Sequence, residues 1–158
     1  MTVVLGIDLA LRRTGIALVD YDSGELAHHA IIETAPAVEL SERLDLIADA
    51  ILAVVDEWTP IEIGIEQPIA YRSGTTTLRL GMAHGAVRLA LWRRCIAPAE
   101  YAPSAVKAHA CGRGGADKAV MVARAQSRWR VELSDDEADA AWIADLHRVR
   151  THEMWEGA

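Results

Sequence analysis

Two short apolar segments that each end in an acidic residue constrain the fold of this chain most strongly. They are Val-Val-Leu-Gly-Ile-Asp at 3–8 and Ile-Glu-Ile-Gly-Ile-Glu at 61–66. Apolar runs of this length are typical of buried strands, and a buried strand gains nothing from a terminal carboxylate unless that group faces solvent, a donor or a cation. If both strands are central and parallel, Asp8 and Glu66 meet at one edge of the sheet, where α/β proteins usually bind ligands. Taken singly, each acid is equally well explained as a strand end.

The order of the remaining elements predicts an α/β fold. Strands are expected at 14–20, 26–32 and 98–101. Helices are expected from a Ser41 cap to just before Pro60, at 77–94, from a Ser104 cap, at 117–129 and at 134–147. Three hairpin-linked strands followed by crossover units is the order found in ribonuclease H-like domains. We therefore expect one domain over 1–158, with a mixed five-stranded sheet covered by helices on both faces.

Composition is that of a folded globular domain. The chain has 158 residues, of which 51% are hydrophobic and 25% charged, which argues against disorder. The opening apolar run has no basic leader and is too short for a signal peptide or a membrane span. Cys95 and Cys111 lack metal-type spacing and are expected to be free thiols. These features predict a cytoplasmic protein without a membrane segment.

Charge is strongly segregated along the chain. The net charge of -7 is unfavourable for a nucleic-acid binder. Residues 67–130, however, contain eleven basic side chains and two acidic ones. Residues 1–66 contain three basic and thirteen acidic side chains, and residues 131–158 contain two basic and eight acidic ones. A basic middle with acidic ends suits a protein whose middle binds phosphates and whose acids bind cations. Alternatively, folding mixes the three segments into a neutral surface.

A third group of acids lies near the C-terminus, in Ser-Asp-Asp-Glu-Ala-Asp-Ala-Ala at 134–141. Asp136 and Asp139 are three residues apart and share one helix face, although Asp135 and Asp139 would share a face equally well. The acids can also be explained by the helix dipole, with Ser134 as the cap. Four converging carboxylates repel one another unless cations neutralise them, and all-oxygen ligands favour Mg²⁺ or Mn²⁺.

These three acidic motifs, Leu-Gly-Ile-Asp ending at Asp8, Ile-Glu-Gln around Glu66, and Asp136 to Ala140, resemble those of the RuvC-type Holliday junction resolvases in order and spacing. The resemblance covers roughly residues 3–147, and the segment 78–86 resembles the family's dimer-forming helix. It implies an endonuclease that makes paired nicks in four-way junctions and leaves 5′-phosphate and 3′-hydroxyl ends. It also implies a homodimer formed through the helix at 77–94. Asp8, Glu66, Asp136 and Asp139 would be catalytic and hold two Mg²⁺ per subunit, with Mn²⁺ as the alternative.

Segments 100–107 and 114–118 resemble the family's DNA-contacting regions, and they contain the only two lysines, Lys107 and Lys118. Arg113, Tyr71 and Arg72 are further candidates for contact with DNA phosphates or unpaired bases. Two positions depart from the family pattern. Leu9-Ala10 replaces Pro-Gly after the first acid, and Pro68 and Ile69 stand where an aromatic residue is expected, with Tyr71 the nearest ring.

These departures leave two alternatives open. The chain can be a nuclease of the same fold that acts more broadly on forks and flaps, or a non-catalytic protein that binds branched DNA.

Overall fold

The computed structural model describes residues 1–70 and 72–156, with side chains to Met154. Five strands form one sheet in the order β3-β2-β1-β4-β5. β1 (Val3–Asp8), β2 (Arg13–Asp20) and β3 (Leu26–Glu33) are antiparallel neighbours, while β4 (Glu62–Glu66) and β5 (Ala99–Tyr101) run parallel to β1. The predicted mixed five-stranded sheet is confirmed.

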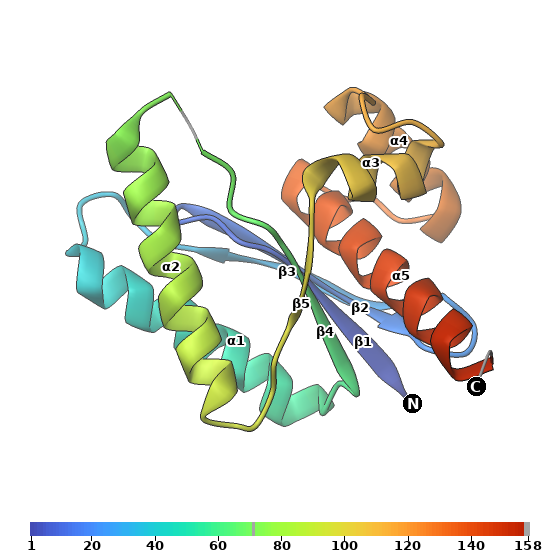
Figure 1. Ribbon diagram of the computed structural model, residues 1–158, viewed down its shortest axis with the longest axis horizontal. Helices are drawn as coiled ribbons and strands as arrows, with labels where there is room; N and C mark the ends of the chain where they lie inside the picture. Colours follow the sequence, from blue (N-terminus) through green and yellow to red (C-terminus); the bar gives the residue numbers. More distant parts are fainter. Residues whose placement is uncertain (71, 157–158) are drawn as a thin grey trace.

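Helices cover both faces of this sheet, as expected (Figure 1). α1 (Leu40–Trp58) and α2 (Gly74–Trp92) pack on one face, and α3 (Pro103–Cys111), α4 (Lys118–Trp129) and α5 (Asp135–Glu156) lie on the other. Each face has its own apolar core. Leu5, Ile7 and Ile65 belong to the core on the α1–α2 side. None of the helices in the described part of the chain is long and apolar enough to cross a membrane.

Several helix ends differ from the sequence prediction. α1 is capped by Glu39 rather than Ser41, and the Glu39 carboxylate accepts from the backbone N–H groups of Ser41 and Glu42. α2 begins at Gly74, three residues early, because Ser73 caps it. Ser104 caps nothing, since Pro103 begins α3 and its fixed φ already suits a first helical turn. α5 continues nine residues beyond the predicted end at His147.

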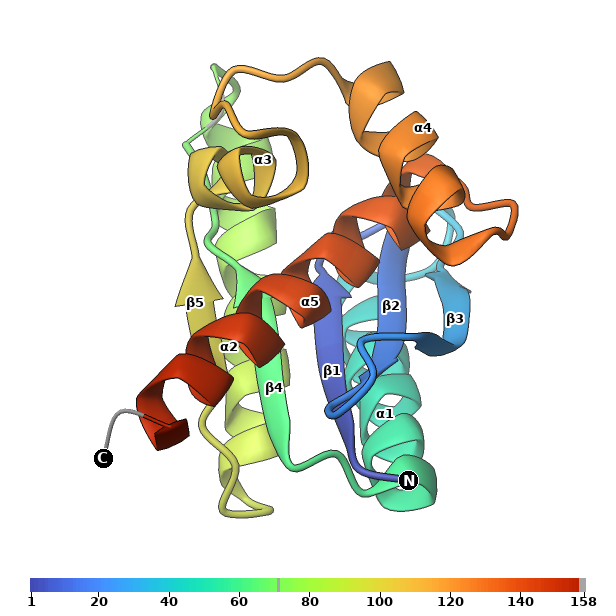
Figure 2. The same cartoon turned by 90° about the vertical axis from the view of Figure 1, so that its right-hand side faces the viewer.

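Three glycines in neighbouring strands allow α5 to cross the sheet at very short range (Figure 2). Gly15, Gly6 and Gly64 lie in β2, β1 and β4, and Gly6 pairs with Gly64. A Cβ atom on Gly15 would overlap the Asp136 carbonyl, and one on Gly6 would lie 2.6 Å from the Ala144 nitrogen. The sheet therefore presents bare backbone to α5, and this fixes where the first turn of that helix sits.

A buried carboxylate joins the three helices on this face. Asp145 of α5 is only 4% exposed. It accepts hydrogen bonds from Arg128 of α4 at 3.1 Å and from Arg148 at 3.0 Å, and it lies 2.8 Å from His109 Nε2 of α3. Burial raises the pKa of Asp145, but these partners lower it more, so its pKa is below the usual value. Asp145 thus anchors α3 and α4 to α5.

Candidate active site

The carboxylates of Asp8 and Glu66 come from the ends of adjacent parallel strands. Ile7 pairs with Ile65, so Asp8 and Glu66 are the next residues on the two strands. Because side chains alternate along a strand, both acids share a sheet face with Gly6 and Gly64, which contact α5. The two strand ends therefore direct their acids toward the start of that helix.

The first turn of α5 is held by a capping box. Ser134 N and Oγ both donate to Glu137 Oε2, at 2.9 and 2.6 Å, and the other Glu137 oxygen lies 2.7 Å from His29 Nδ1. Both oxygens of the Glu137 carboxylate therefore have partners within the fold. Asp136 and Asp139 are free to line the cavity beside β1 and β4, while the Asp135 side chain is 61% exposed and lies outside the cavity lining.

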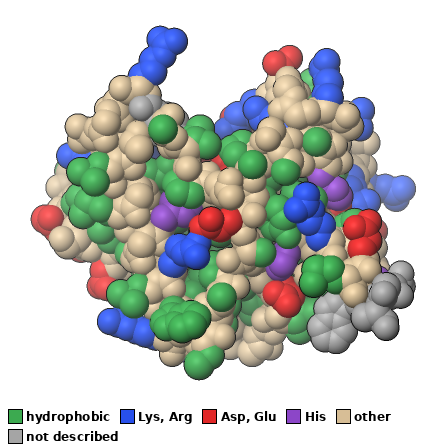
Figure 3. Space-filling model, viewed as in Figure 1, with side chains coloured by type: hydrophobic (Ala, Val, Ile, Leu, Met, Phe, Trp, Pro, Cys, Tyr) green, Lys and Arg blue, Asp and Glu red, His purple; other side chains and the backbone are tan. Residues whose placement is uncertain are grey.

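A cavity of about 210 Å³ joins these groups. Its lining includes the four acids Asp8, Glu66, Asp136 and Asp139, together with Lys118, His84 and Leu80. Figure 3 shows the molecule hollowed between the start of α2 and the α3–α4 region, with Lys and Arg side chains on both sides. The structure thus brings acids from three distant segments to one enclosed place.

Burial and mutual repulsion raise the pKa values of the acids. Burial, followed by the charges of Glu66, Asp139 and Asp136, raises the pKa of Asp8 well above its usual value. Burial and then Asp139 raise the pKa of Glu66 to about 7, and burial is also the largest cause of the raised pKa of Asp139. Such a cluster is unfavourable without positive charge, which a bound cation supplies.

Two basic side chains supply part of this charge. Lys118 Nζ lies 3.7 Å from both Asp135 and Asp139 and 3.9 Å from Asp136. Burial lowers the pKa of Lys118, but these carboxylates raise it more, so the net shift is upward. Arg13 Nε donates to Asp136 Oδ2 at 2.9 Å, and its Nη1 donates to Glu33 Oε1 at 2.6 Å. The carboxylates are therefore oriented toward cations of the protein.

The donor set fits a hard divalent ion in chemistry, because it consists of carboxylate oxygens that raise one another's pKa values. Within residues 1–70 and 72–156, no three acidic, histidine or cysteine side chains are arranged to hold a single ion. Asp136 is turned toward Arg13, and Asp139 toward Lys118. A ligating arrangement requires these two side chains to turn from Arg13 and Lys118 toward the other acids of the cavity.

The predicted DNA-contacting residues differ in their relation to the cavity. Lys118 lines it, and Lys107 of α3 is near enough to lower the pKa values of Glu66 and Asp139 by its charge. Arg72, just before α2, and Arg113, just after α3, are exposed and outside the cavity lining. Tyr71 lies outside the described residues.

Sequence reasoning missed His84 and Arg13. His84 falls in the segment 78–86, for which the sequence predicted only a dimer-forming helix, yet it is buried and lines the cavity. No local pattern distinguishes it, because its neighbours in α2 belong to an ordinary helix. Arg13 carried a weak signal, since it stands only five residues after Asp8 and begins the hairpin strand beside it.

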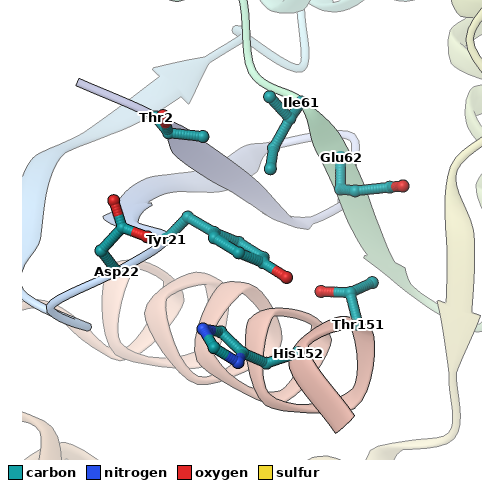
Figure 4. A pocket seen from close by; sticks show the side chains of 7 residues that line it. All are labelled: Thr2, Tyr21, Asp22, Ile61, Glu62, Thr151 and His152. Atoms are coloured by element: carbon teal, nitrogen blue, oxygen red, sulfur yellow. The ribbon is translucent and has the colours of Figure 1, made fainter. Parts of the chain in front are cut away.

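A larger hollow of about 560 Å³ lies at the other end of the sheet (Figure 4). Tyr21 and His152 stack there with ring centroids 5.0 Å apart, and Asp22 and Glu62 add two acids. Among the described residues that line it there is no Lys or Arg to bind a phosphate. The smaller cavity, which Lys118 lines together with the four acids, is therefore the better candidate for binding a phosphate.

Comparison with known proteins identifies the family. The sequence profile described as "Crossover junction endodeoxyribonuclease RuvC" matches residues 4–147, which is most of the chain and includes all four cavity acids. The chain belongs to the RuvC family. Members of this family are metal-dependent nucleases.

Individual RuvC relatives are similar over nearly their whole length. The protein from Nitrobacter hamburgensis is 38% identical over 152 residues, which cover 91% of this chain and 87% of the relative. The protein from Xanthomonas oryzae pv. oryzae is 33% identical, with 98% of each chain covered. The structure of Thermus thermophilus RuvC in complex with Holliday junction substrate is 25% identical, with a TM-score of 0.87, and covers 98% of this chain and 97% of that one. The RuvC fold therefore extends over the described elements.

Proposed function

We propose that this chain is a metal-dependent endodeoxyribonuclease that makes paired nicks in Holliday junctions and leaves 5′-phosphate and 3′-hydroxyl ends. The observation that carries this proposal is the convergence of Asp8, Glu66, Asp136 and Asp139 on one cavity beside Lys118. The RuvC relatives support the substrate, since the Thermus thermophilus RuvC structure is described as a complex with Holliday junction substrate.

In this proposal the four acids hold two divalent ions, Mg²⁺ or Mn²⁺. When bound, these ions supply activation of water and neutralisation of charge on the phosphodiester. Lys118 and Lys107 bind phosphates beside the cavity and hold the strand in register. Arg72 and Arg113, which lie further out, extend this contact along the DNA backbone. Arg13 holds one oxygen of Asp136, which limits the rotation of that carboxylate.

A homodimer through α2 belongs to the same proposal. Leu78, Met82, Leu89 and Trp92 are exposed large apolar side chains on this helix. Gly81 and Gly85 face open space, so a second helix can approach closely there. A twofold dimer presents two related active sites to the two related strands of a four-way junction.

The decisive test is a nicking assay on a synthetic four-way junction with Mg²⁺, with EDTA, and with Glu66→Gln. Glu62→Gln is a matched control, because Glu62 begins the same strand and lies outside the cavity lining. We expect symmetric nicks that DNA ligase can seal, lost in EDTA and in Glu66→Gln but retained in Glu62→Gln. Cleavage that persists in EDTA would refute the metal-dependent mechanism. A wild type that binds the junction without cutting it would favour a non-catalytic binder.

A broader nuclease acting on forks and flaps is the second candidate, and Ile69 favours it. This residue lines the cavity and is 44% exposed, at the position where the family is expected to insert an aromatic ring between bases. Cleavage rates on junctions, forks and flaps should be compared side by side for the wild type and for Ile69→Phe. Equal rates on all three substrates in the wild type would support the broader activity.

We also propose a cytoplasmic location. Both cysteines are free, and DNA is the proposed substrate.

A further inference from the structure

His84 is a buried polar residue that the proposed chemistry has not used. Its side chain comes from the middle of α2, is only 5% exposed, and lines the cavity that holds the acids. Its Nδ1 is shielded from solvent and has no hydrogen-bond partner. Leaving such an atom unpaired costs stability. An apolar residue at this position would avoid that cost, so packing alone does not account for the histidine.

The placement of α2 suggests what His84 meets. Asp136, Asp139 and Lys118 approach the cavity from α5 and α4 on one face of the sheet, whereas α2 covers the opposite face (Figure 1). His84 and its neighbour Leu80, one turn earlier, thus form the wall across from the α5 acids. A phosphodiester that enters the cavity has carboxylates on one side and the imidazole on the other.

The charge of His84 suits this position. Burial, and then the nearby charge of Arg88, lower the pKa of His84 to about 4. A neutral imidazole has one N–H donor and one acceptor nitrogen. It does not repel divalent cations in the same cavity, and its N–H can donate to an anionic oxygen. Since Nδ1 is enclosed, Nε2 is the nitrogen available to a ligand.

We propose that His84 is a substrate-contacting residue whose imidazole donates a hydrogen bond to a non-bridging oxygen of the scissile phosphodiester. The proposal rests on the nuclease function above and deepens it, because it assigns a contact on the wall that carries no acids. A preorganised donor to an oxygen that gains charge in the transition state typically contributes about 10²–10³ in rate.

The test uses the full-length chain with a labelled four-way junction under single-turnover conditions at saturating Mg²⁺. His84→Leu removes both ring nitrogens. We expect it to melt at the wild-type temperature or higher, to bind the junction in Ca²⁺ within about threefold of wild type, and to cleave about 100-fold more slowly. His84→Gln keeps an N–H donor and should recover part of the rate. Leu91→Met is the matched control, because it alters a buried side chain of the same helix that lies outside the cavity lining, and it should cleave normally.

A phosphorothioate at the scissile linkage provides a second measurement that a purely structural role would not affect. One stereoisomer should slow the wild type while producing no additional slowing in His84→Leu, since the contact is already absent. Additive effects of both stereoisomers, or His84→Leu cleavage within threefold of wild type, would overturn the proposal. If the wild type itself fails to cleave any branched DNA, the nuclease function fails first, and this contact fails with it.

Discussion

Replacing Gly6 by alanine tests whether the closeness of α5 to the sheet sets the geometry of the active site. The new Cβ would overlap the Ala140 carbonyl oxygen and would lie 2.6 Å from the Ala144 nitrogen and 2.9 Å from the Ala144 Cβ, whereas ordinary contacts begin at 3.4 Å. The Ala144 nitrogen alone therefore requires the helix to retreat by about 0.8 Å, and the overlap with the Ala140 carbonyl requires more. Overpacking of this kind typically costs about 1–3 kcal/mol, and the melting temperature should be about 5–10 °C below that of the wild type.

The same shift should reduce cleavage, because Asp139 directly precedes the displaced Ala140. A misplacement near 1 Å can reduce a reaction rate by about 100-fold. We expect a loss of this order for Gly6→Ala in single-turnover cleavage, measured at a temperature where the variant is folded. Alanine substitutions at two other glycines serve as comparisons with weaker expected clashes. In Gly64→Ala the new Cβ would lie 3.1 and 3.2 Å from side-chain atoms and 3.4 Å from the Ile143 carbonyl oxygen, so the effect should be milder. In Gly74→Ala it would have no neighbour within 4 Å, so this variant should behave like the wild type. A Gly6→Ala protein with wild-type stability and rate would refute the reasoning. Lost stability with a normal rate would show that Asp139 is positioned by other contacts.

Three further predictions concern charge. Between about pH 4.5 and 7, in EDTA, the folded chain retains a proton on Glu66 that the unfolded chain releases. The free energy of unfolding should therefore fall by at most about 3 kcal/mol as the pH rises through this range, and by less where solvent screens the charge. Thermal melts at several pH values should show this slope in the wild type and a flatter one in Glu66→Gln. Asp145→Asn removes the buried negative charge that pairs with the partly exposed Arg128 and Arg148, and should cost about 1.5–3 kcal/mol in denaturant unfolding, unlike exposed Asp117→Asn. Lys107→Ala should reduce the salt slope of junction binding by about 1, and an unchanged slope would exclude a phosphate contact.

The sequence predicted the sheet and the acid-bearing strand ends well, because buried strands leave a strong local pattern. Asp8 stands out because a carboxylate that ends a buried apolar run needs solvent, a donor or a cation, and the parallel pairing of β1 with β4 places Glu66 beside it. Helix starts were predicted less well. At the start of α1, Glu39 caps in place of Ser41, because a carboxylate competes with a hydroxyl for the same free N–H groups.

Other features depend on tertiary contact and leave no local signal. Gly6 and Gly64 look like ordinary strand glycines until α5 is placed against them. The choice between Asp135 and Asp136 for the cavity depends on how α5 is rotated about its axis, which the capping box and the glycine contacts fix. His84 lacked a signal for the same reason, since its burial depends on the packing of α2 above the strand ends.

The anchoring of α3 and α4 by Asp145 has a mechanical consequence. Asp145 stands nine residues along α5 from Asp136, about 13.5 Å at the usual helical rise. The helices that carry Lys107 and Lys118 are thus tied to the helix that carries Asp136 and Asp139, so we expect the proposed phosphate-binding lysines to move together with these two carboxylates. Accommodation of branch points with different arm angles must then come from bending of the DNA or from pivoting between subunits.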